Sequence, residues 1–312
     1  MRVVGAMEYG GPEVLQVAEV PEPQAGPGQM RIRVHAAAVN PTDTYVGTGA
    51  RAEMQKDDPP PYVPGMDAAG VLDQIGEGVE TELAVGDHVM AIVLPKGSHG
   101  AYSEYLVLPA ASVARVPAGA TDAEASTLPM NGLTARLTLD LLALVPGQTL
   151  AVTGAAGCYG GYVVQLAKAD GLRVVADASE ADEQLVRDLG ADVVVRRGDD
   201  VAARIRDVVP DGVDGLADGS VQNELLLPAI KDGGGFATVR AWNGPSERGI
   251  TIHAVWVRSY LKEQAKLDRL RQQVEDGAVT LRVARTFPAA EAAEAHRLLA
   301  AGGMRGRLVL EL

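Results

Sequence analysis

A strand, a glycine-rich turn, a helix and a second strand follow one another between residues 151 and 177. The apolar start AVT leads into the turn GAAGCYGG, a stretch with helical spacing comes next, and the run RVVAD reads as a strand. In such a unit the turn and the helix N-terminus present backbone N–H groups to a phosphate. The stretch therefore predicts a βαβ unit that cradles the pyrophosphate of a dinucleotide.

Strand-like and helical stretches alternate in the part of the chain around this unit. Helical stretches such as YVVQLAKA and EADEQLVRDLG separate the first five of the strand candidates, which are TLAVTG, RVVAD, DVVVR, GVDGLAD, GGFATV and ITIHAVWV. Alternation at this spacing is typical of a parallel sheet with helices on both faces. The predicted fold class is therefore α/β, with a Rossmann-type sheet.

The flanking parts of the chain have a different pattern. Residues 1 to about 120 are short β-rich runs interrupted by glycine and proline, which predicts short strands and turns. A helical stretch then covers residues 121–145, with Thr121 and Asp122 as candidate caps. After Tyr260 a charged helix precedes a strand, a helix and a strand, and we expect this ending to pack back on the N-terminal part.

Charge and composition limit the partners and the compartment. The 312 residues carry 28 basic and 41 acidic side chains, a net charge of −13, which disfavours nucleic acid and anionic membrane surfaces. No apolar run is long enough for a membrane span or a signal peptide, and the one cysteine excludes an internal disulfide. The sequence therefore predicts a cytoplasmic protein without a nucleic-acid or membrane partner.

The glycine turn itself identifies the residues that would meet a phosphate. Gly157 and Gly160 stand where the backbone must approach the phosphate and where the helix must pack on the strand. We expect Ala156, Cys158 and Tyr159 to contribute to the same cradle through their backbone. The Tyr159 ring either lies along the cofactor or packs internally. Cys158 either has a thiolate stabilised by the helix N-terminus or is a buried thiol, and the second is favoured because no histidine is near in sequence.

The residues after the second strand bear on the choice between NAD and NADP. Asp177 lies twenty residues after Gly157, where an acid that binds an NAD ribose is found. Strand alternation, however, predicts that Ala178, followed by Ser179, occupies the ribose position and leaves room for a 2′-phosphate. Arg196 and Arg197 end the next strand and either pair with that phosphate or are simply solvated. The prediction is NADP(H), with NAD(H) not excluded.

Several segments in the same order resemble the medium-chain dehydrogenase/reductase superfamily, and specifically its zinc-free quinone oxidoreductase branch. These segments are GGPEVL, AAAVNPTD, VPGMDAAGVLDQIGEGV, VGDHV, GAYSEYLVLPA, LPMNGLTA, VTGAAG and AAEAHRLLAAGGMRGRLVL. The resemblance implies a GroES-like β-barrel-type catalytic domain split by an inserted Rossmann domain, with the active site in the cleft between them. It places the first part of the catalytic domain at residues 1–122, the cofactor domain at 123–260 and the second part at 261–312. A homodimer is also expected.

The resemblance also shows which metal ligands the chain lacks. Zinc-dependent members carry a cysteine ligand in the segment written here NPTD and a histidine in the segment written GMD. This chain has Pro41, Thr42 and Met66 in those segments. A structural zinc lobe needs four cysteines, and the five histidines are scattered without ligand spacing. No metal site is therefore predicted.

Without zinc, the resemblance implies reduction of a quinone or another activated C=C or C=O bond, such as that of an enone, by NADPH. The same pattern gives Tyr45 as a hydrogen-bond or proton donor to substrate, with a packed tyrosine as the alternative. Asn40 would orient substrate or ribose, and Thr134 would contact the nicotinamide. Asp43 is expected to be structural. Arg51 stands where relatives often have a second tyrosine, and it either meets an anionic substrate or is solvated.

Two other functions remain open at this point. A 2-enoyl thioester reductase would use the same cofactor, but it needs a basic groove for a pantetheine-phosphate arm that the sequence does not locate. A protein of another class, a non-catalytic NADP(H)-binding regulator or nucleic-acid-binding relative, is disfavoured by the negative charge and by the retained Asn40 and Tyr45.

Overall fold

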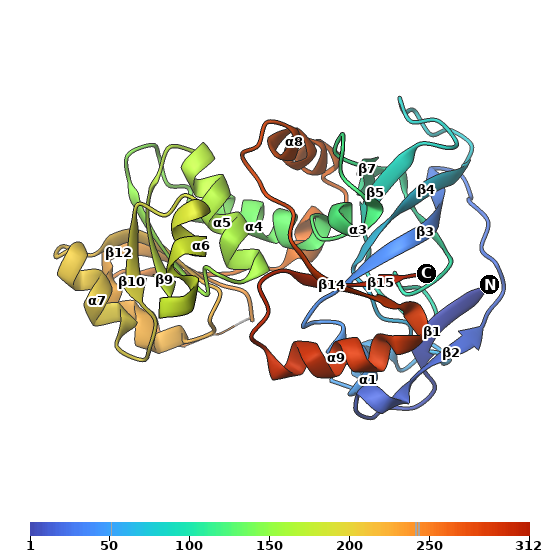
Figure 1. Cartoon of the computed structure of the whole chain (residues 1–312), viewed down its shortest axis with the longest axis horizontal. Helices are drawn as coiled ribbons and strands as arrows, with labels where there is room; N and C mark the ends of the chain where they lie inside the picture. The colour runs from blue at the N-terminus through green and yellow to red at the C-terminus, as the bar shows by residue number, and fades with distance from the viewer. Residues whose placement is uncertain (51, 241, 243) are drawn as a thin grey trace. The chain divides into compact units, whose positions relative to one another are not determined.

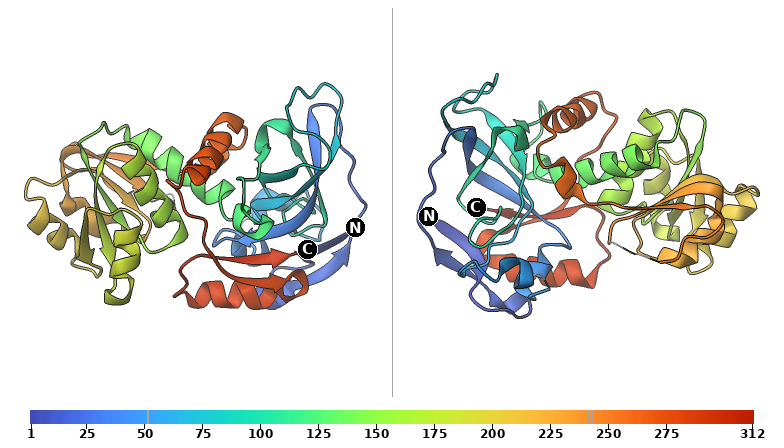
Figure 2. Two further views of the ribbon diagram at one scale, coloured as in Figure 1. Left: turned by 45° about the horizontal axis from the view of Figure 1, so that its top comes forward. Right: turned by 180° about the vertical axis from the view of Figure 1, so that it is seen from behind.

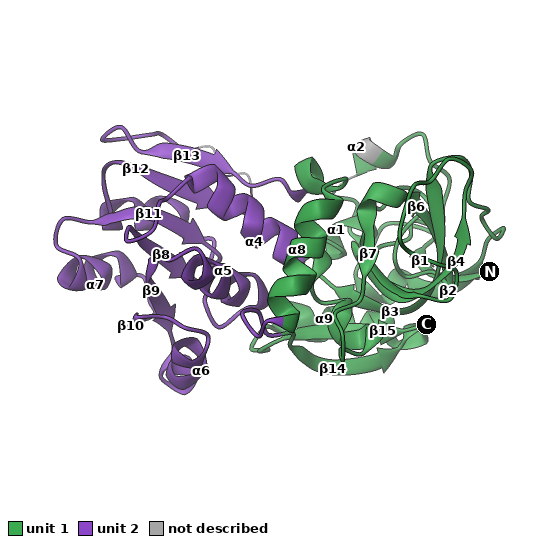
Figure 3. Ribbon diagram, turned by 90° about the horizontal axis from the view of Figure 1, so that it is seen from above, with its two compact units in different colours: residues 1–130, 258–275, 281–312 green, residues 131–257, 276–280 purple. Residues whose placement is uncertain are grey.

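Strand β3 (Gln29–Val39) is the longest strand among the described residues, and it holds together the first of two units of the chain. The structure is a computed structural model that describes residues 1–50, 52–240, 242 and 244–312. Unit 1 comprises residues 1–130, 258–275 and 281–312, and unit 2 comprises residues 131–257 and 276–280 (Figure 3). Unit 2 is thus inserted in the chain of unit 1. The two compact units divide after Met130 and after Val257. The domain boundaries expected from the sequence, after residues 122 and 260, stay predictions.

Unit 1 is built on a seven-stranded sheet in which β3 has neighbours on both sides. The strand order is β14-β15-β3-β4-β5-β7, and β6 also pairs with β3. These strands are β4 (Asp67–Ile75), β5 (His88–Ile92), β6 (Tyr105–Pro109), β7 (Val113–Arg115), β14 (Val283–Pro288) and β15 (Arg307–Glu311). A separate antiparallel pair joins β1 (Arg2–Ala6) to β2 (Leu15–Glu19).

The C-terminal strand closes onto the N-terminal part of the chain, as the sequence predicts. Strand β15 pairs antiparallel with the end of β3, with Leu308 opposite Val39. Both termini therefore belong to unit 1 (Figures 1 and 2). The core of the unit contains Ile32, Leu72 and Phe287, each at most 1% exposed. Its helices are α1 (Thr44–Gly47), α2 (Ala52–Gln55), α3 (Asp122–Ala125), α8 (Gln264–Glu275) and α9 (Ala292–Ala301).

Unit 2 carries a six-stranded sheet in which every neighbouring pair is parallel. The strand order is β10-β9-β8-β11-β12-β13. These strands are β8 (Thr149–Thr153), β9 (Arg173–Ala178), β10 (Val193–Arg196), β11 (Val213–Asp218), β12 (Ile230–Thr238) and β13 (Thr251–Ala254). Each coincides with one of the six predicted strands. The order reverses between β8 and β11, which is the position where doubly wound sheets bind nucleotides.

The helices of unit 2 follow the predicted alternation with two differences. They are α4 (Pro129–Leu142), α5 (Cys158–Ala169), α6 (Glu183–Asp188) and α7 (Val201–Val208). The helical stretch predicted for residues 121–145 is divided, because α3 ends before α4 starts at Pro129, the residue type that cannot continue a helix. Thr121 is the cap of α3, as expected. Between β11 and β12 the chain forms a 3-10 helix, η4 (Asn223–Ala229), which contains Pro228.

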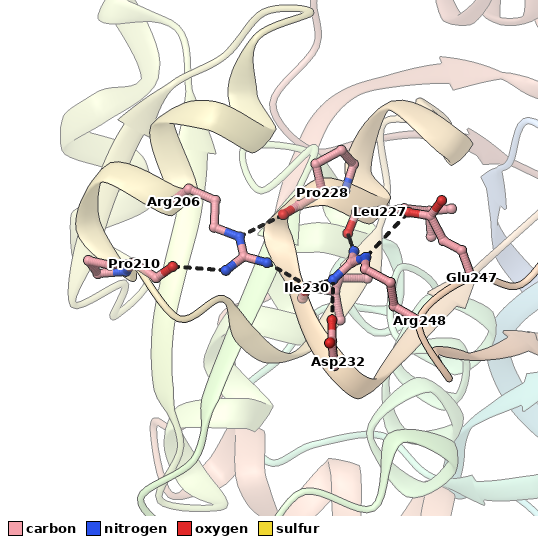
Figure 4. Close-up of polar contacts among 8 residues, drawn as sticks. All are labelled: Arg206, Pro210, Leu227, Pro228, Ile230, Asp232, Glu247 and Arg248. Carbon is pink, nitrogen blue, oxygen red and sulfur yellow. Dashed lines mark hydrogen bonds and ion pairs between the residues drawn. The ribbon is translucent and has the colours of Figure 1, made fainter.

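Two arginines fix the junction between η4 and β12 (Figure 4). Arg206 of α7 donates to the carbonyl oxygens of Pro228 at 2.6 Å and Ile230 at 3.0 Å. Arg248 donates to Leu227 at 2.6 Å and to the same Ile230 carbonyl at 2.8 Å. The last carbonyls of a helix have no partner inside the helix, so these bonds satisfy them and set the start of β12. No described helix is both long and apolar enough to cross a membrane.

Candidate functional site

The glycine turn joins β8 to α5 through two close backbone approaches. A Cβ atom on Gly154, which has a φ of +68°, would lie 2.8 Å from the backbone of Gly219 at the end of β11. A Cβ atom on Gly160 would lie 2.3 Å from the carbonyl oxygen of Gly154. Real Cβ contacts are never so short, so only glycine lets α5 pack this tightly against the turn.

The N-terminus of α5 is arranged to receive an anion. Helix α5 begins at Cys158, and its N-cap Gly157 has no side chain that could cap the first turn. The first N–H groups of a helix have no partner within the helix, and the helix dipole favours negative charge beside them. The sequence-predicted residues Ala156, Gly157, Cys158, Tyr159 and Gly160 are thus consecutive around a helix N-terminus. This local structure fits the pyrophosphate of a dinucleotide.

Tyr159 and Cys158 are both turned into the protein. The Tyr159 hydroxyl lies 2.8 Å from Thr138 Oγ1 on α4, and the Thr138 hydroxyl donates to the Thr134 carbonyl oxygen at 2.9 Å. Burial raises the pKa of Tyr159 above its usual range. Cys158 is 6% exposed. This geometry favours the packing alternative for Tyr159, while its contact with a cofactor, and that of the buried Thr134, stay predictions.

The structure corrects the direction that strand alternation predicts for the Asp177 side chain. Its carboxylate accepts a hydrogen bond from the Ala155 N–H at 3.2 Å, so the side chain faces the glycine turn rather than the opposite side of the sheet. Burial raises the pKa of Asp177, whereas the Ala155 N–H and the charge of Arg197 lower it. The Asp177 carboxylate therefore lies beside the glycine turn, on the side of the sheet from which strand alternation would have excluded it. The position of Ala178 beside a ribose stays a prediction.

The other residues that are predicted to bind the nucleotide already make polar contacts with one another and with nearby acids around the end of β9. Arg196 lies 3.3 Å from Glu180 in an exposed ion pair. The Ser179 hydroxyl donates to Asp182 at 2.5 Å, and the Arg197 N–H donates to the Ala178 carbonyl at 2.8 Å. An exposed ion pair is worth at most about 1 kcal/mol, so a phosphate could displace Glu180 from Arg196.

A buried aspartate that the sequence argument missed organises the end of β11. Asp218 is 0% exposed and accepts hydrogen bonds from the Thr153 hydroxyl at 2.9 Å and from the N–H groups of Val221 and Asn223, both at 2.8 Å. It thereby holds the loop after β11 against the end of β8, next to the glycine turn. The residue ends a predicted strand, which is the only sequence signal that could have found it.

In unit 1 the predicted residue Asn40 is at the centre of a buried polar network. Its side-chain amide donates to Asp67 Oδ2 at 2.7 Å, and its backbone N–H donates to Asp43 Oδ2 at 2.8 Å. Asp67 Oδ1 also accepts the N–H of Met130 at 2.6 Å. Asn40, Asp43 and Asp67 are each at most 1% exposed. The structure thus gives Asn40 and Asp43 a role in fixing the backbone of this segment, while the orientation of a substrate by Asn40 stays a prediction.

The network continues to residues far away in the sequence. The Tyr102 hydroxyl donates to Asp43 Oδ2 at 3.3 Å and lies 3.0 Å from His296 Nε2. Burial raises the pKa of Asp43 and that of Asp67 to about 7, and the nearby charge of Arg307 opposes both increases. Burial also lowers the pKa of His296 to about 4. Asn40 is thus bonded to two buried carboxyls whose pKa values are raised, and one of these carboxyls, Asp43, is linked through Tyr102 to His296.

Tyr45 sits on the short helix that this network supports. It lies in α1 and is half-buried, so part of its surface is accessible. The Asp43 N–H donates to the Asn40 carbonyl at 2.9 Å, and the Tyr45 N–H donates to Thr42 at 3.3 Å. The segment that carries Tyr45 is therefore held by backbone bonds on its N-terminal side. Arg51 lies outside the described residues.

The two positions where zinc-dependent proteins carry ligands are in direct contact here. The Thr42 hydroxyl donates a hydrogen bond to the Met66 sulfur at 3.3 Å. A neutral hydroxyl and a thioether are poor ligands for Zn²⁺, which takes thiolate, imidazole and carboxylate donors. The donor set at this position therefore does not fit a zinc ion.

Comparison with known proteins decides the family. Residues 26–118 match the alcohol dehydrogenase GroES-like domain, and residues 189–310 match the zinc-binding dehydrogenase family. The quinone oxidoreductase of Mus musculus is 30% identical to this chain, and the match covers 100% of this chain and 98% of the relative. The chain belongs to the medium-chain dehydrogenase/reductase superfamily. The resemblance to its quinone oxidoreductase branch and the predicted α/β architecture with GroES-like and Rossmann-type parts are both confirmed.

Other members of the superfamily cover the same length. A 2-haloacrylate reductase from Burkholderia sp is 30% identical, and the match covers 96% of each chain. A mycobacterial protein solved in complex with NADPH is 26% identical, with a TM-score of 0.85 and full coverage of both chains.

The sequence analysis missed four buried residues of the two networks described above, which are Asp67, Tyr102, His296 and Asp218. Asp67 directly follows the GM of a recognised segment and could have been found there, but no spacing connects Tyr102 to His296.

Proposed function

We propose that this chain is an NADPH-dependent reductase that transfers hydride to a quinone or to another activated C=C or C=O bond, such as that of an enone, without a metal ion. The observation that carries this proposal is the glycine turn, which has close backbone approaches at Gly154 and Gly160 and is followed by a helix whose N-cap, Gly157, provides no side-chain cap. The relatives named quinone oxidoreductase and 2-haloacrylate reductase support this reaction class. When bound, the reduced nicotinamide supplies the hydride.

The chain's own residues would bind the cofactor through backbone and charge. The N–H groups at the start of α5 would hold the pyrophosphate. Arg196 and Arg197, which are both exposed, would pair with a 2′-phosphate after Arg196 leaves Glu180. Asp177 is the group that opposes this choice, because a carboxylate facing the turn repels a phosphate and suits ribose hydroxyls. The NADPH complex of a mycobacterial relative favours the phosphate-bearing cofactor.

On the substrate side, Tyr45 would stabilise the negative charge that develops on the substrate oxygen. A phenol hydroxyl that donates to this oxygen does for a conjugated carbonyl what a metal ion does for an alcohol. The network behind Asn40 would hold the segment 40–45 in one geometry, because Asn40 and Asp43 are bonded to each other in both directions. Reduction of an activated double bond needs no Lewis acid, which agrees with the hydroxyl and thioether at Thr42 and Met66.

A substrate panel tests this proposal directly. NADPH and NADH oxidation should be followed with quinones, enones, 2-enoyl thioesters and simple aldehydes, with and without a strong chelator. We expect turnover of quinones or enones with NADPH that chelation leaves unchanged. Turnover of 2-enoyl thioesters alone would assign the chain to that substrate class. Cofactor binding without turnover of any substrate would contradict the reductase proposal and favour a regulatory protein.

A further inference from the structure

We propose that His35, His88 and Asp122 form a binding site for a divalent transition-metal ion such as Zn²⁺ on unit 1. His35 Nδ1 lies 2.7 Å from Asp122 Oδ2, and His88 Nδ1 lies 2.8 Å from Asp122 Oδ1. The three donor atoms are all within 4.8 Å of one another. His35 and His88 are far apart in the sequence, and the fold brings both to the Asp122 carboxylate.

A β-bulge aims His35 at this position. In the pairing of β3 with β4, Val34 is opposite Gly70 and Ala36 is opposite Ala69, so His35 is the extra residue. A Cβ atom on Gly70 would lie 2.1 Å from the Arg33 carbonyl oxygen and 2.9 Å from the His35 nitrogen, so glycine is required beside the bulge. Bulges redirect a side chain relative to the regular strand. The bulge therefore gives His35 a direction that strand alternation alone would not.

The other two ligands are anchored on separate elements. His88 begins β5, opposite Val71, and its carbonyl oxygen accepts the Val116 N–H at 3.1 Å. Asp122 is the first residue of α3, whose start is fixed by a capping box between Thr121 and Glu124. Three backbones that are each held independently thus converge on one point. This arrangement fixes the backbone positions of the three residues before any ion binds, which lowers the entropic cost of coordination.

The donor chemistry suits a borderline metal ion. Two imidazole nitrogens and one carboxylate oxygen are ligands for Zn²⁺, Co²⁺, Ni²⁺ and Cu²⁺, whereas Mg²⁺ and Ca²⁺ prefer oxygen alone. Donors on one tetrahedral Zn²⁺ ion lie about 3.3 Å apart, given bonds of about 2.0–2.1 Å. The two N–O distances of 2.7 and 2.8 Å would open, and the three donor atoms, now within 4.8 Å of one another, would adjust to this spacing. The His88 side chain is 58% exposed, so it has room to move and leaves the remaining coordination positions to water.

The site is separate from the proposed reaction chemistry. It shares no residue with the network of Asn40, Asp43 and Asp67 or with the contact between Thr42 and Met66. An ion at this site would join β3, β5 and α3 and would stabilise the folded unit, because it binds the folded chain in preference to the unfolded one. The alternative is that Asp122 only accepts hydrogen bonds from the two histidines.

Metal titration of the tag-free protein separates these alternatives. After chelation and buffer exchange, the full chain should be titrated with Zn²⁺ by calorimetry and with Co²⁺ by visible absorption, and its Tm should be measured with and without Zn²⁺. We expect one ion per chain, a cobalt spectrum with ligand-field bands, and a higher Tm with Zn²⁺. His88→Gln should weaken binding by about ten- to hundred-fold and reduce the Tm increase at a given Zn²⁺ concentration. His253→Gln, which removes a histidine from unit 2, is the matched control and should bind as wild type does.

A second variant guards against a fold defect. Asp122→Asn keeps the shape of the side chain and leaves the Thr121 cap in place, so its apo Tm should stay near that of wild type while Zn²⁺ binding weakens. Equal Zn²⁺ affinity in wild type, His88→Gln and Asp122→Asn would overturn the proposal. The absence of any Tm increase in wild type with millimolar Zn²⁺ would also overturn it and would leave a simple hydrogen-bonded cluster. NADPH-dependent turnover plays no part in these readouts.

Discussion

The hydroxyl of Thr42 donates a hydrogen bond to the sulfur of Met66 at 3.3 Å, at the two positions where zinc-dependent members of the superfamily carry metal ligands. Two side chains that are poor ligands for Zn²⁺ are thus bonded to each other. The neighbouring Asp67, which could have offered a carboxylate, accepts hydrogen bonds from Asn40 and from Met130. The donors at these positions are therefore engaged in contacts within the protein and do not offer the thiolate and imidazole ligands of the zinc-dependent members.

The first prediction is that removal of metal ions leaves turnover unchanged. Dialysis against a strong chelator should not alter kcat with a quinone or enone, because the substrate oxygen meets hydrogen-bond donors rather than a Lewis acid. The Tm can fall in the same experiment if the histidine site is loaded, so rate and Tm must be measured together. A rate that is lost on chelation and restored by Zn²⁺ would contradict the prediction.

The second prediction concerns the Tyr45 hydroxyl. Tyr45→Phe should lower kcat by roughly ten- to hundred-fold, because it removes one transition-state hydrogen bond worth about 1–3 kcal/mol. The affinity for NADPH should hardly change. Tyr105→Phe is a matched control, since Tyr105 lies on β6 and its ring contacts Arg31 of β3. A wild-type rate in Tyr45→Phe would show that the residue only packs.

The third prediction tests the cofactor preference. Replacement of both Arg196 and Arg197 by alanine should weaken NADPH binding by roughly ten- to hundred-fold and leave NADH nearly unaffected, since a charge-assisted bond to phosphate is worth about 1.5–3 kcal/mol. Arg187→Ala, which breaks a comparable exposed pair with Glu183, is the control. Fluorescence titration of both cofactors gives the answer. Tighter NADH binding in wild type would mean that Asp177 holds the ribose hydroxyls.

The fourth prediction separates two glycines of the turn. Gly160→Ala should lower the free energy of unfolding by about 1–3 kcal/mol, because the new methyl group would meet the Gly154 carbonyl at 2.3 Å. Gly157→Ala places its methyl 3.1 Å from the same oxygen, so the fold should survive with a smaller loss while phosphate access is reduced. Chemical denaturation and NADPH titration measure the two effects. Equal stability of the two variants would contradict the packing argument.

The fifth prediction is a pH dependence from the buried carboxyls. The pKa of Asp43 is raised to about 7 by burial, so between about pH 4 and pH 7 the folded chain keeps a proton that the unfolded chain has lost. The free energy of unfolding that this group contributes is therefore present at low pH and is lost as the pH rises through 7. In Asp43→Asn, the free energy of unfolding should fall by about 1–4 kcal/mol less than in wild type when the pH rises from 4.5 to 7.5. Chemical denaturation at a series of pH values measures this difference.

Titration of His296 changes the free energy of unfolding with pH in the opposite direction, so a His296 variant provides a comparison for Asp43→Asn. Burial lowers the pKa of His296 to about 4, so its contribution to stability grows as the pH rises from about 4 to 6.5. His296→Gln should therefore steepen the decline that Asp43→Asn flattens. An identical pH profile in wild type and both variants would show that the network does not exchange protons in this range.

The sequence alone determined the features that depend on near neighbours in the chain. The alternation of apolar runs and helical stretches predicted all six strands of unit 2, because strand and helix periodicity are local properties. The glycine turn was readable for the same reason, since the need for glycine at Gly154 and Gly160 follows from the tight strand–turn–helix path. The replacement of the family's two zinc-ligand positions by Thr42 and Met66 was also visible in the sequence.

Only the tertiary structure decided how side chains from distant segments meet. The Asp177 carboxylate faces the glycine turn, where it accepts a hydrogen bond from the N–H of Ala155, a residue 22 positions away. The bond between Tyr102 and His296 joins residues 194 positions apart. His35 reaches Asp122 through a bulge that only the register of β3 and β4 reveals. Such contacts are fixed by packing and register across the whole unit, and no local pattern in the chain encodes them.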